Sequence, residues 1–321
     1  MKLMRYRRGA EARLAVWEGD AAADLADALD REKLDARARA ALADTAAFIA
    51  AGDNATGLAQ RALDLVRAGG PGRVQPAELV LLAPIVPSLL LCSGENYWDH
   101  RDEKPAVTRK DPEFFTKTAL GVIGPDDSIE RDEKVTRKLD YETELAIVIG
   151  RPGRHIPEER ALEHVFGYTI LNDVTARDRQ VTLRPDGSSV YNLGPGKNFD
   201  TCAPIGPWIV TRDEIADPQQ LELTTRVNGE LRQQNTTGKM IWTCAQLIAF
   251  FSTFVTLRAG VVISTGTPGG TAWGTDAELG GTKPMRPGLE GQRGYLQPGD
   301  EVVCAIERIG ELRNPVIAAP G

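Results

Sequence analysis

Cysteine and histidine are scarce in this chain of 321 residues, which contains four cysteines and three histidines. The cysteines lie far apart, and no two of them form a C-x-x-C pair: Cys92, Cys202, Cys244 and Cys304. Structural zinc sites and disulfide frameworks both require clustered or regularly spaced cysteines. We therefore expect neither in this protein.

Long apolar runs and a strong net charge are also missing. The most apolar stretch, residues 79–92, is too short to span a membrane and contains two prolines. The basic N-terminus is followed by no apolar segment of the kind that forms a signal peptide. A net charge of -7 argues against nucleic acid or an anionic membrane as the main partner. We expect a cytoplasmic globular protein.

The chain contains two successive regions that differ in composition and in predicted secondary structure. Residues 1 to about 70 are rich in alanine with helical spacing, after a predicted hairpin near the N-terminus, and the breaker cluster "RAGGPGRVQP" marks a boundary. We divide the chain into a small N-terminal α/β domain, 1–88, and a catalytic domain, 89–321. In the second region short strands outnumber helices and do not alternate with them, which disfavours a doubly wound sheet or a TIM barrel. The predicted class is α+β, mostly β.

Two glutamates open the most apolar predicted strand, "LDYETELAIVIG". Glu142 and Glu144 are two residues apart, so on a strand they point to the same face, about 6.8 Å apart. Like charges entering an apolar region repel each other and lose hydration, and a divalent cation would remove both penalties. The alternative is an exposed strand end with two hydrated glutamates.

A third acid and a polar helix face are predicted in "GYTILNDVTARDRQ". Asp173 falls where a strand passes into a short helix, and its alternative role is that of an N-cap. Arg177 and Gln180 follow at i+4 and i+7, on one helical face. Together they would form a polar wall for a carboxylated ligand, although Arg177 alone could be part of a solvated ion pair.

Base and cation candidates come from three further segments. His100 precedes Glu103 by three residues, which on a helical turn gives a base and the carboxylate that orients it, or else a surface pair. Lys197 lies in a Gly/Pro-rich loop, and Lys117 follows two phenylalanines. Such lysines are often solvated, but near a carboxylate-bound cation they would attract an anionic substrate.

Taken together and in order, these motifs resemble the fumarylacetoacetate hydrolase family over roughly residues 88–315. The resemblance rests on "GENYWDHRDE", "FFTKTA", "LDYETELAIVIG", "GYTILNDVTARDRQ", "KNFDTCAPIGPWIV", "VNGELRQ", "STGTPGG" and "LQPGDEVVCAIERIGEL". It implies a mixed β-sandwich roll as the catalytic domain and a homodimer. The implied cofactor is Mg²⁺ or Mn²⁺, and Ca²⁺ could replace it in crystals.

The resemblance also assigns roles to individual residues. The metal ligands would be Glu142, Glu144 and Asp173, and the catalytic residues His100, Glu103 and Lys197. The substrate-binding residues would be Arg177, Gln180, Lys117 and Thr267. A Gly-rich insertion, residues 271–295, departs from the family pattern and could lean over the site and bias substrate choice.

The function expected from this resemblance is hydrolysis of a C–C bond in a 2,4-dioxo acid of the acylpyruvate type, giving pyruvate or a related 2-oxo acid and a carboxylic acid. Oxaloacetate decarboxylation and isomerisation of a 2-hydroxy-diene-dioate are alternatives on the same site. A metal-stabilised binding protein without turnover is a further alternative. The presence of His100, Glu103 and Lys197 argues against it, because a structural metal needs none of them.

Overall fold

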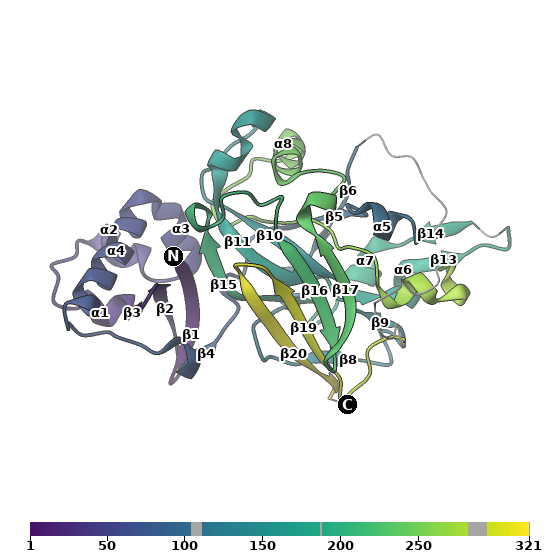
Figure 1. The fold of residues 1–321 in the computed structure, drawn as a ribbon, viewed down its shortest axis with the longest axis horizontal. Helices are drawn as coiled ribbons and strands as arrows, with labels where there is room; N and C mark the ends of the chain where they lie inside the picture. The colour runs from purple at the N-terminus through teal and green to yellow at the C-terminus, as the bar shows by residue number, and fades with distance from the viewer. Residues whose placement is uncertain (104–110, 187, 282–293, 321) are drawn as a thin grey trace.

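The computed structural model describes residues 1–103, 111–186, 188–281 and 294–320. Two β-sheets form the larger part of the molecule, and a group of short helices covers the N-terminal strands on one side (Figure 1). Strands dominate and do not alternate regularly with helices. The predicted α+β, mostly β class is confirmed.

The larger sheet has 11 strands and runs β3-β2-β1-β15-β11-β10-β18-β5-β6, with β4 paired to β1 and β7 paired to β15. Its strands are β1 (Lys2–Arg8), β2 (Glu11–Glu18), β3 (Ala21–Asp24), β4 (Val80–Leu81), β5 (Leu90–Gly94), β6 (Glu113–Lys117), β7 (Val122–Ile123), β10 (Thr143–Ile149), β11 (Val165–Asn172), β15 (Ala203–Thr211) and β18 (Val262–Ser264).

The second sheet has five strands in the order β17-β16-β19-β20-β8. Its strands are β8 (Ile129–Arg131), β16 (Glu222–Val227), β17 (Glu230–Thr236), β19 (Glu301–Ile306) and β20 (Gly310–Ala318). The predicted Asn228-Gly229 turn joins β16 to β17, with both of its residues at positive φ. Two short pairs complete the strands: β9 (Leu139–Asp140) with β12 (Thr175–Ala176), and β13 (Val181–Leu183) with β14 (Ser189–Tyr191).

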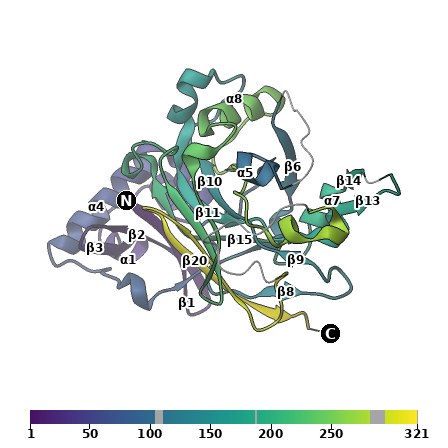
Figure 2. The same cartoon turned by 45° about the vertical axis from the view of Figure 1, so that its right-hand side comes forward.

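The helices are short except for α4, near the N-terminal end, and α8, beside β6 (Figure 2). The α-helices are α1 (Leu25–Ala28), α2 (Ala36–Ala41), α3 (Thr45–Ala51), α4 (Asp53–Arg67), α5 (Trp98–Arg101), α6 (Arg177–Gln180), α7 (Leu193–Lys197) and α8 (Cys244–Phe254). The 3₁₀ turns are η1 (Pro76–Glu78), η2 (Ala119–Gly121), η3 (Glu158–His164), η4 (Arg212–Glu214), η5 (Thr237–Lys239), η6 (Ala272–Thr275) and η7 (Ala277–Leu279). None of the helices formed by the described residues has the length and apolar character needed to cross a membrane.

Strand β10 is buried along its whole length because both of its faces meet a core. Leu145, Ile147 and Ile149 belong to the core cluster shared with the second sheet. Ala146 and Val148 point the other way, into a cluster that also holds residues of the N-terminal helices. A strand covered on both faces needs a continuous apolar run rather than an alternating one, which accounts for its sequence.

The N-terminal hairpin is confirmed, with β1 and β2 paired across a turn at Gly9. β1 also pairs with β15, Lys2 opposite Val210, so the N-terminal strands extend the larger sheet. One core cluster therefore includes residues from both sides of the predicted boundary. The division into 1–88 and 89–321 stays a prediction.

The predicted helix over residues 174–180 is wrong in its first half. Thr175 and Ala176 pair with Asp140 and Leu139 as a short antiparallel ladder, and the helix begins at Arg177. Asp173 is therefore not an N-cap, because Ala176 occupies that position.

Candidate metal and acid–base site

Three carboxylates converge where β10 begins and β11 ends. Glu142 precedes β10, Glu144 lies within it, and Asp173 directly follows β11. The two strands are antiparallel, with Thr143 opposite Asn172, so these positions are neighbours. The three side chains are buried, and each offers an oxygen within 4.8 Å of the other two. The alternative of hydrated glutamates at an exposed strand end is wrong.

The two glutamates of this acidic triad differ in their surroundings. Burial alone would raise the pKa of Glu142, but Arg177 and Lys197 outweigh it and hold the pKa well below its usual range. For Glu144, burial raises the pKa, and the charges of Asp173 and Glu142 add to the increase. Its Oε2 accepts hydrogen bonds from the Ser264 hydroxyl and from Gly266 N at 3.0 Å. The pKa values of the two glutamates are therefore shifted in opposite directions, so Glu144 holds its proton to a higher pH than Glu142.

Both predicted lysines are buried against the triad, so the solvated alternative is wrong for each. Lys197, at the end of α7, donates to Glu142 Oε2 at 2.6 Å, Asp173 Oδ2 at 2.8 Å and Thr175 Oγ1 at 2.7 Å. Lys117, at the end of β6, donates to Asp173 Oδ1 at 2.5 Å and to the Val174 carbonyl at 3.0 Å. Burial would lower the pKa of Lys117, but the adjacent Asp173 outweighs it and raises the pKa.

The donor set fits a hard divalent cation. Mg²⁺ and Mn²⁺ prefer carboxylate oxygens, and here three of them lie on fixed positions of paired strands. Glu142 and Asp173 are also paired with cationic side chains, which offset part of the negative charge of the three carboxylates. The triad could therefore bind a divalent metal ion.

The predicted dyad forms on and after α5. His100 Nδ1 lies 2.7 Å from Glu103 Oε2, and both side chains are buried, so the surface-pair alternative is wrong. Glu103 is itself held by Gly270 N at 2.7 Å and by the Thr271 hydroxyl at 3.0 Å. Burial would lower the pKa of His100, but the hydrogen bond and charge of Glu103 outweigh it and raise the pKa.

The triad and His100 line one cavity of about 40 Å³, and Glu103 lies behind His100. Arg177, Gln180, Lys197 and Thr267 also line it, as predicted for residues near a ligand. The cavity thus suits a small, charged ligand.

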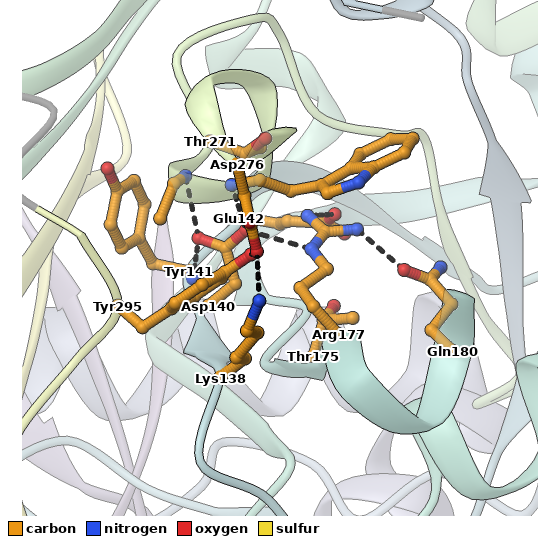
Figure 3. Close-up of polar contacts among 12 residues, drawn as sticks. Lys138, Asp140, Tyr141, Glu142, Thr175, Arg177, Gln180, Thr271, Asp276 and Tyr295 are labelled. Atoms are coloured by element: carbon orange, nitrogen blue, oxygen red, sulfur yellow. Dashed lines mark hydrogen bonds and ion pairs between the residues drawn. The ribbon is translucent and has the colours of Figure 1, made fainter. Parts of the chain in front are cut away.

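The alternative of a solvated ion pair is wrong for Arg177. Its side chain is 1% exposed, and its ion-pair partners Asp140 and Glu142 are buried as well. Its Nε donates to Asp140 Oδ2 at 2.8 Å, Nη1 donates to Gln180 Oε1 at 2.8 Å, and Nη2 donates to Glu142 (Figure 3). Burial would lower the pKa of Arg177, but Glu142 and Asp140 outweigh it and raise the pKa. Arg177 joins the triad to Asp140.

Asp140 is the site residue that the sequence reasoning missed. It is fully buried and accepts hydrogen bonds from Arg177 and from the backbone N–H groups of Ala272 and Trp273, at 3.0 and 3.1 Å. A signal was present, since Asp140, Glu142 and Glu144 alternate along the sequence. The start of the predicted insertion thus lies at the site, whereas its residues 282–293 fall outside the described part of the chain.

Comparison with known proteins places this site in a family. Residues 90–317 match the model described as the fumarylacetoacetate (FAA) hydrolase C-terminal domain. The chain belongs to the fumarylacetoacetate hydrolase family. The resemblance predicted from the motifs is confirmed, and with it the fold of the catalytic part.

Individual members show how far the likeness extends. The oxaloacetate tautomerase fahd2, mitochondrial, of Xenopus laevis is 39% identical over 271 residues, which cover 84% of this chain and 77% of that protein. The oxaloacetate tautomerase YisK of Bacillus subtilis is 41% identical over 244 residues, covering 75% and 74% of the two chains. The solved fumarylacetoacetate hydrolase of Exiguobacterium antarcticum superposes with a TM-score of 0.76 at 36% identity, covering 99% of each chain. Members of this family are enzymes, and the comparisons span more than one reaction.

Proposed function

We propose that this protein is a metal-dependent tautomerase that interconverts the enol and keto forms of a small 2-oxo dicarboxylic acid of the oxaloacetate type. The observation that carries the proposal is a buried His100, hydrogen-bonded to Glu103, that lines the same small cavity as the acidic triad. Two relatives near 40% identity are named oxaloacetate tautomerases, which supports this reaction over the acylpyruvate hydrolysis expected from the sequence.

A Mg²⁺ or Mn²⁺ ion held by Glu142, Glu144 and Asp173 would supply Lewis-acid stabilisation for the negative charge that develops on the oxygen of a 2-oxo acid. The rest of the chemistry falls to the side chains around the cavity. Lys197 contributes a second positive charge next to the triad. That charge favours binding of an anionic substrate and supports the developing oxyanion.

His100 is the residue proposed to move the proton. Glu103 Oε2 accepts a hydrogen bond from the Nδ1–H of His100, which fixes the ring and leaves Nε2 as the atom that exchanges a proton with the substrate. In the keto-to-enol direction the neutral His100 takes a proton from the third carbon at Nε2 and delivers it to the 2-oxo oxygen, so the ring ends as it began. In the reverse direction the same proton returns to carbon. No bond between heavy atoms is broken, so the reaction needs no water in the cavity.

The test follows the loss of the ultraviolet absorbance of enol-oxaloacetate in the presence of Mg²⁺ or Mn²⁺. The wild-type protein should accelerate ketonisation, and His100→Ala should reduce the enzymatic rate by about 10²- to 10⁴-fold, the range that a positioned acid–base group contributes. His155→Ala is the matched control, because His155 is exposed and lies away from the cavity. Equal rates for wild type and His100→Ala would contradict the proposal.

Hydrolysis of a 2,4-dioxo acid is the second candidate, because an oriented histidine can also activate a water molecule. The likeness to a solved fumarylacetoacetate hydrolase favours keeping it. Pyruvate release from acetylpyruvate separates it from tautomerisation, and pyruvate release from oxaloacetate reports decarboxylation. Decarboxylation that persists in His100→Ala, without acylpyruvate cleavage in either protein, would support a decarboxylase, since loss of CO₂ needs no attacking water. The 2-hydroxy-diene-dioate isomerase stays a prediction, with loss of the diene absorbance as its measurement.

We also propose the homodimer and the boundary near residue 88 that the sequence suggested. Light scattering coupled to gel filtration measures the first. Limited proteolysis, followed by mass spectrometry of the fragments, measures the second.

A further inference from the structure

Trp273 lines the cavity, and none of the roles assigned above involves this residue. It lies in η6, at the start of the insertion, and is 3% exposed. Its ring packs edge-on against His100, with the ring centroids 6.3 Å apart, and against Tyr191 at 6.2 Å. The Arg177 guanidinium carbon lies 5.3 Å from its centroid. The indole therefore touches both the proposed proton-transfer residue and the arginine that binds the triad.

Hydrogen bonds hold Trp273 in place both at its backbone and at its side chain. Its backbone N–H donates to Asp140 at 3.1 Å, and its Nε1 donates to the Leu279 carbonyl at 3.0 Å. Thr271, two residues before Trp273, donates to Glu103 of the dyad. Figure 3 shows Asp140 beside Arg177, with Thr271 close by. A side chain held in this way cannot swing aside without breaking contacts that also support the site.

We propose that Trp273 determines substrate size, restricting the cavity to short 2-oxo acids and excluding those with a bulky apolar group beyond the third carbon. The inference deepens the proposed function, since it rests on a 2-oxo acid as the ligand. A group attached to the carbon from which His100 takes a proton must lie next to the ring that packs on His100. Because the indole is held in place, a carboxylate or methyl group can lie beside it, whereas a bulky phenyl group would meet the ring.

The size limit can be measured by binding alone. Oxalate and oxanilate (N-phenyl oxamate) share the two-carbon acid that mimics a 2-oxo acid, and they differ by the added phenylamino group. Isothermal titration calorimetry in Mg²⁺ should give a Kd for oxalate with the wild-type protein and far weaker binding of oxanilate. Trp273→Leu should improve the affinity for oxanilate relative to oxalate by about 10-fold or more, as expected for removing steric exclusion from an apolar wall.

Three further variants keep the test decisive. Trp273→Ala opens the cavity further and serves if the leucine variant folds poorly, as judged by its circular dichroism and thermal melt. Trp273→Phe retains an aromatic wall and should shift the affinity ratio less than either. Trp17→Ala removes a tryptophan from β2, where it packs against Trp208 outside the cavity, and should leave the ratio unchanged.

The results distinguish this inference from the proposed function. If the wild type binds oxalate but does not accelerate enol-oxaloacetate ketonisation, the tautomerase proposal fails while the size limit is still measured. If the wild type is a tautomerase and Trp273→Leu and Trp273→Ala both keep the wild-type affinity ratio, the size-limit proposal is overturned. Equal weakening of both ligands would also overturn it, because Trp273 would then support the site without selecting by size.

Discussion

Replacing Glu144 by glutamine should make the metal-free protein more stable near neutral pH. Apart from Glu144, the site contains equal numbers of acidic and basic side chains that form ion pairs with one another. The acids are Asp140, Glu142 and Asp173, and the bases are Lys117, Lys197 and Arg177. An ionised Glu144 adds an uncompensated charge at a position that is 1% exposed. Glutamine has nearly the same shape and can still accept the hydrogen bonds of Ser264 and Gly266.

The size of the effect follows from proton linkage. Burial and the neighbouring carboxylates raise the pKa of Glu144 in the folded protein. At any pH between the ordinary pKa of a glutamate and this raised pKa, the folded state therefore holds one more proton than the unfolded state. The free energy of unfolding then falls as the pH rises, by about 1.4 kcal/mol per pH unit. The Glu144→Gln variant lacks this loss, so its advantage should grow by up to about 3 kcal/mol between pH 5 and pH 7.

Urea unfolding in the presence of a chelator, at pH 5, 6 and 7, measures this difference. Glu133→Gln is the control, because Glu133 is exposed and its removal should give a constant difference across the range. Adding Mg²⁺ supplies the second measurement. At about 100 times its Kd the ion should stabilise the wild type by about 2.7 kcal/mol and should release a proton on binding. A pH-independent difference between Glu144→Gln and wild type, or equal stabilisation of both by Mg²⁺, would refute the reasoning.

Three other predictions concern the residues around the triad. Glu103→Gln removes the charge that raises the pKa of His100, while the burial that lowers this pKa remains. The neutral, reactive imidazole should then form at lower pH, so the rise of the ketonisation rate with pH should also move to lower pH, which a pH–rate profile measures. Lys197→Met should reduce the ketonisation rate about 10²- to 10³-fold, measured at saturating substrate, since one stabilising donor is lost. Asp140→Asn removes one of the two carboxylate partners of the buried Arg177 and should lower the free energy of unfolding by about 3 kcal/mol, measured by urea unfolding.

Local signals in the sequence predicted the elements that depend on neighbouring residues. The Asn228-Gly229 turn produced the β16–β17 hairpin because both residues tolerate positive φ. The His100–Glu103 pair formed because residues three apart meet on one helical turn. The apolar run of β10 likewise required no knowledge of distant residues to be recognised as a buried strand.

Contacts between distant residues set what the sequence could not predict. Lys117 and Lys197 are 56 and 24 residues from Asp173, and nothing local indicates that both ammonium groups meet it. Asp140 lies 132 residues from Ala272, whose N–H it accepts, so its role in fixing Trp273 depends on the whole fold. The helix expected from Val174 failed for the same reason, since pairing with Leu139 and Asp140 held residues 175–176 extended.

The apolar run that follows the two glutamates helps to hold the three buried acids of the site together. Burying Glu142, Glu144 and Asp173 together opposes folding, and the arrangement depends on the register of β10 against β11. A slip of one residue would send both glutamates to the other face of the sheet, away from Asp173 and Lys197. Residues 145–149 are buried on both faces of β10, in two different cores, so such a slip would also misplace five apolar side chains. The cost of that misplacement fixes the register, and the register brings the acids together.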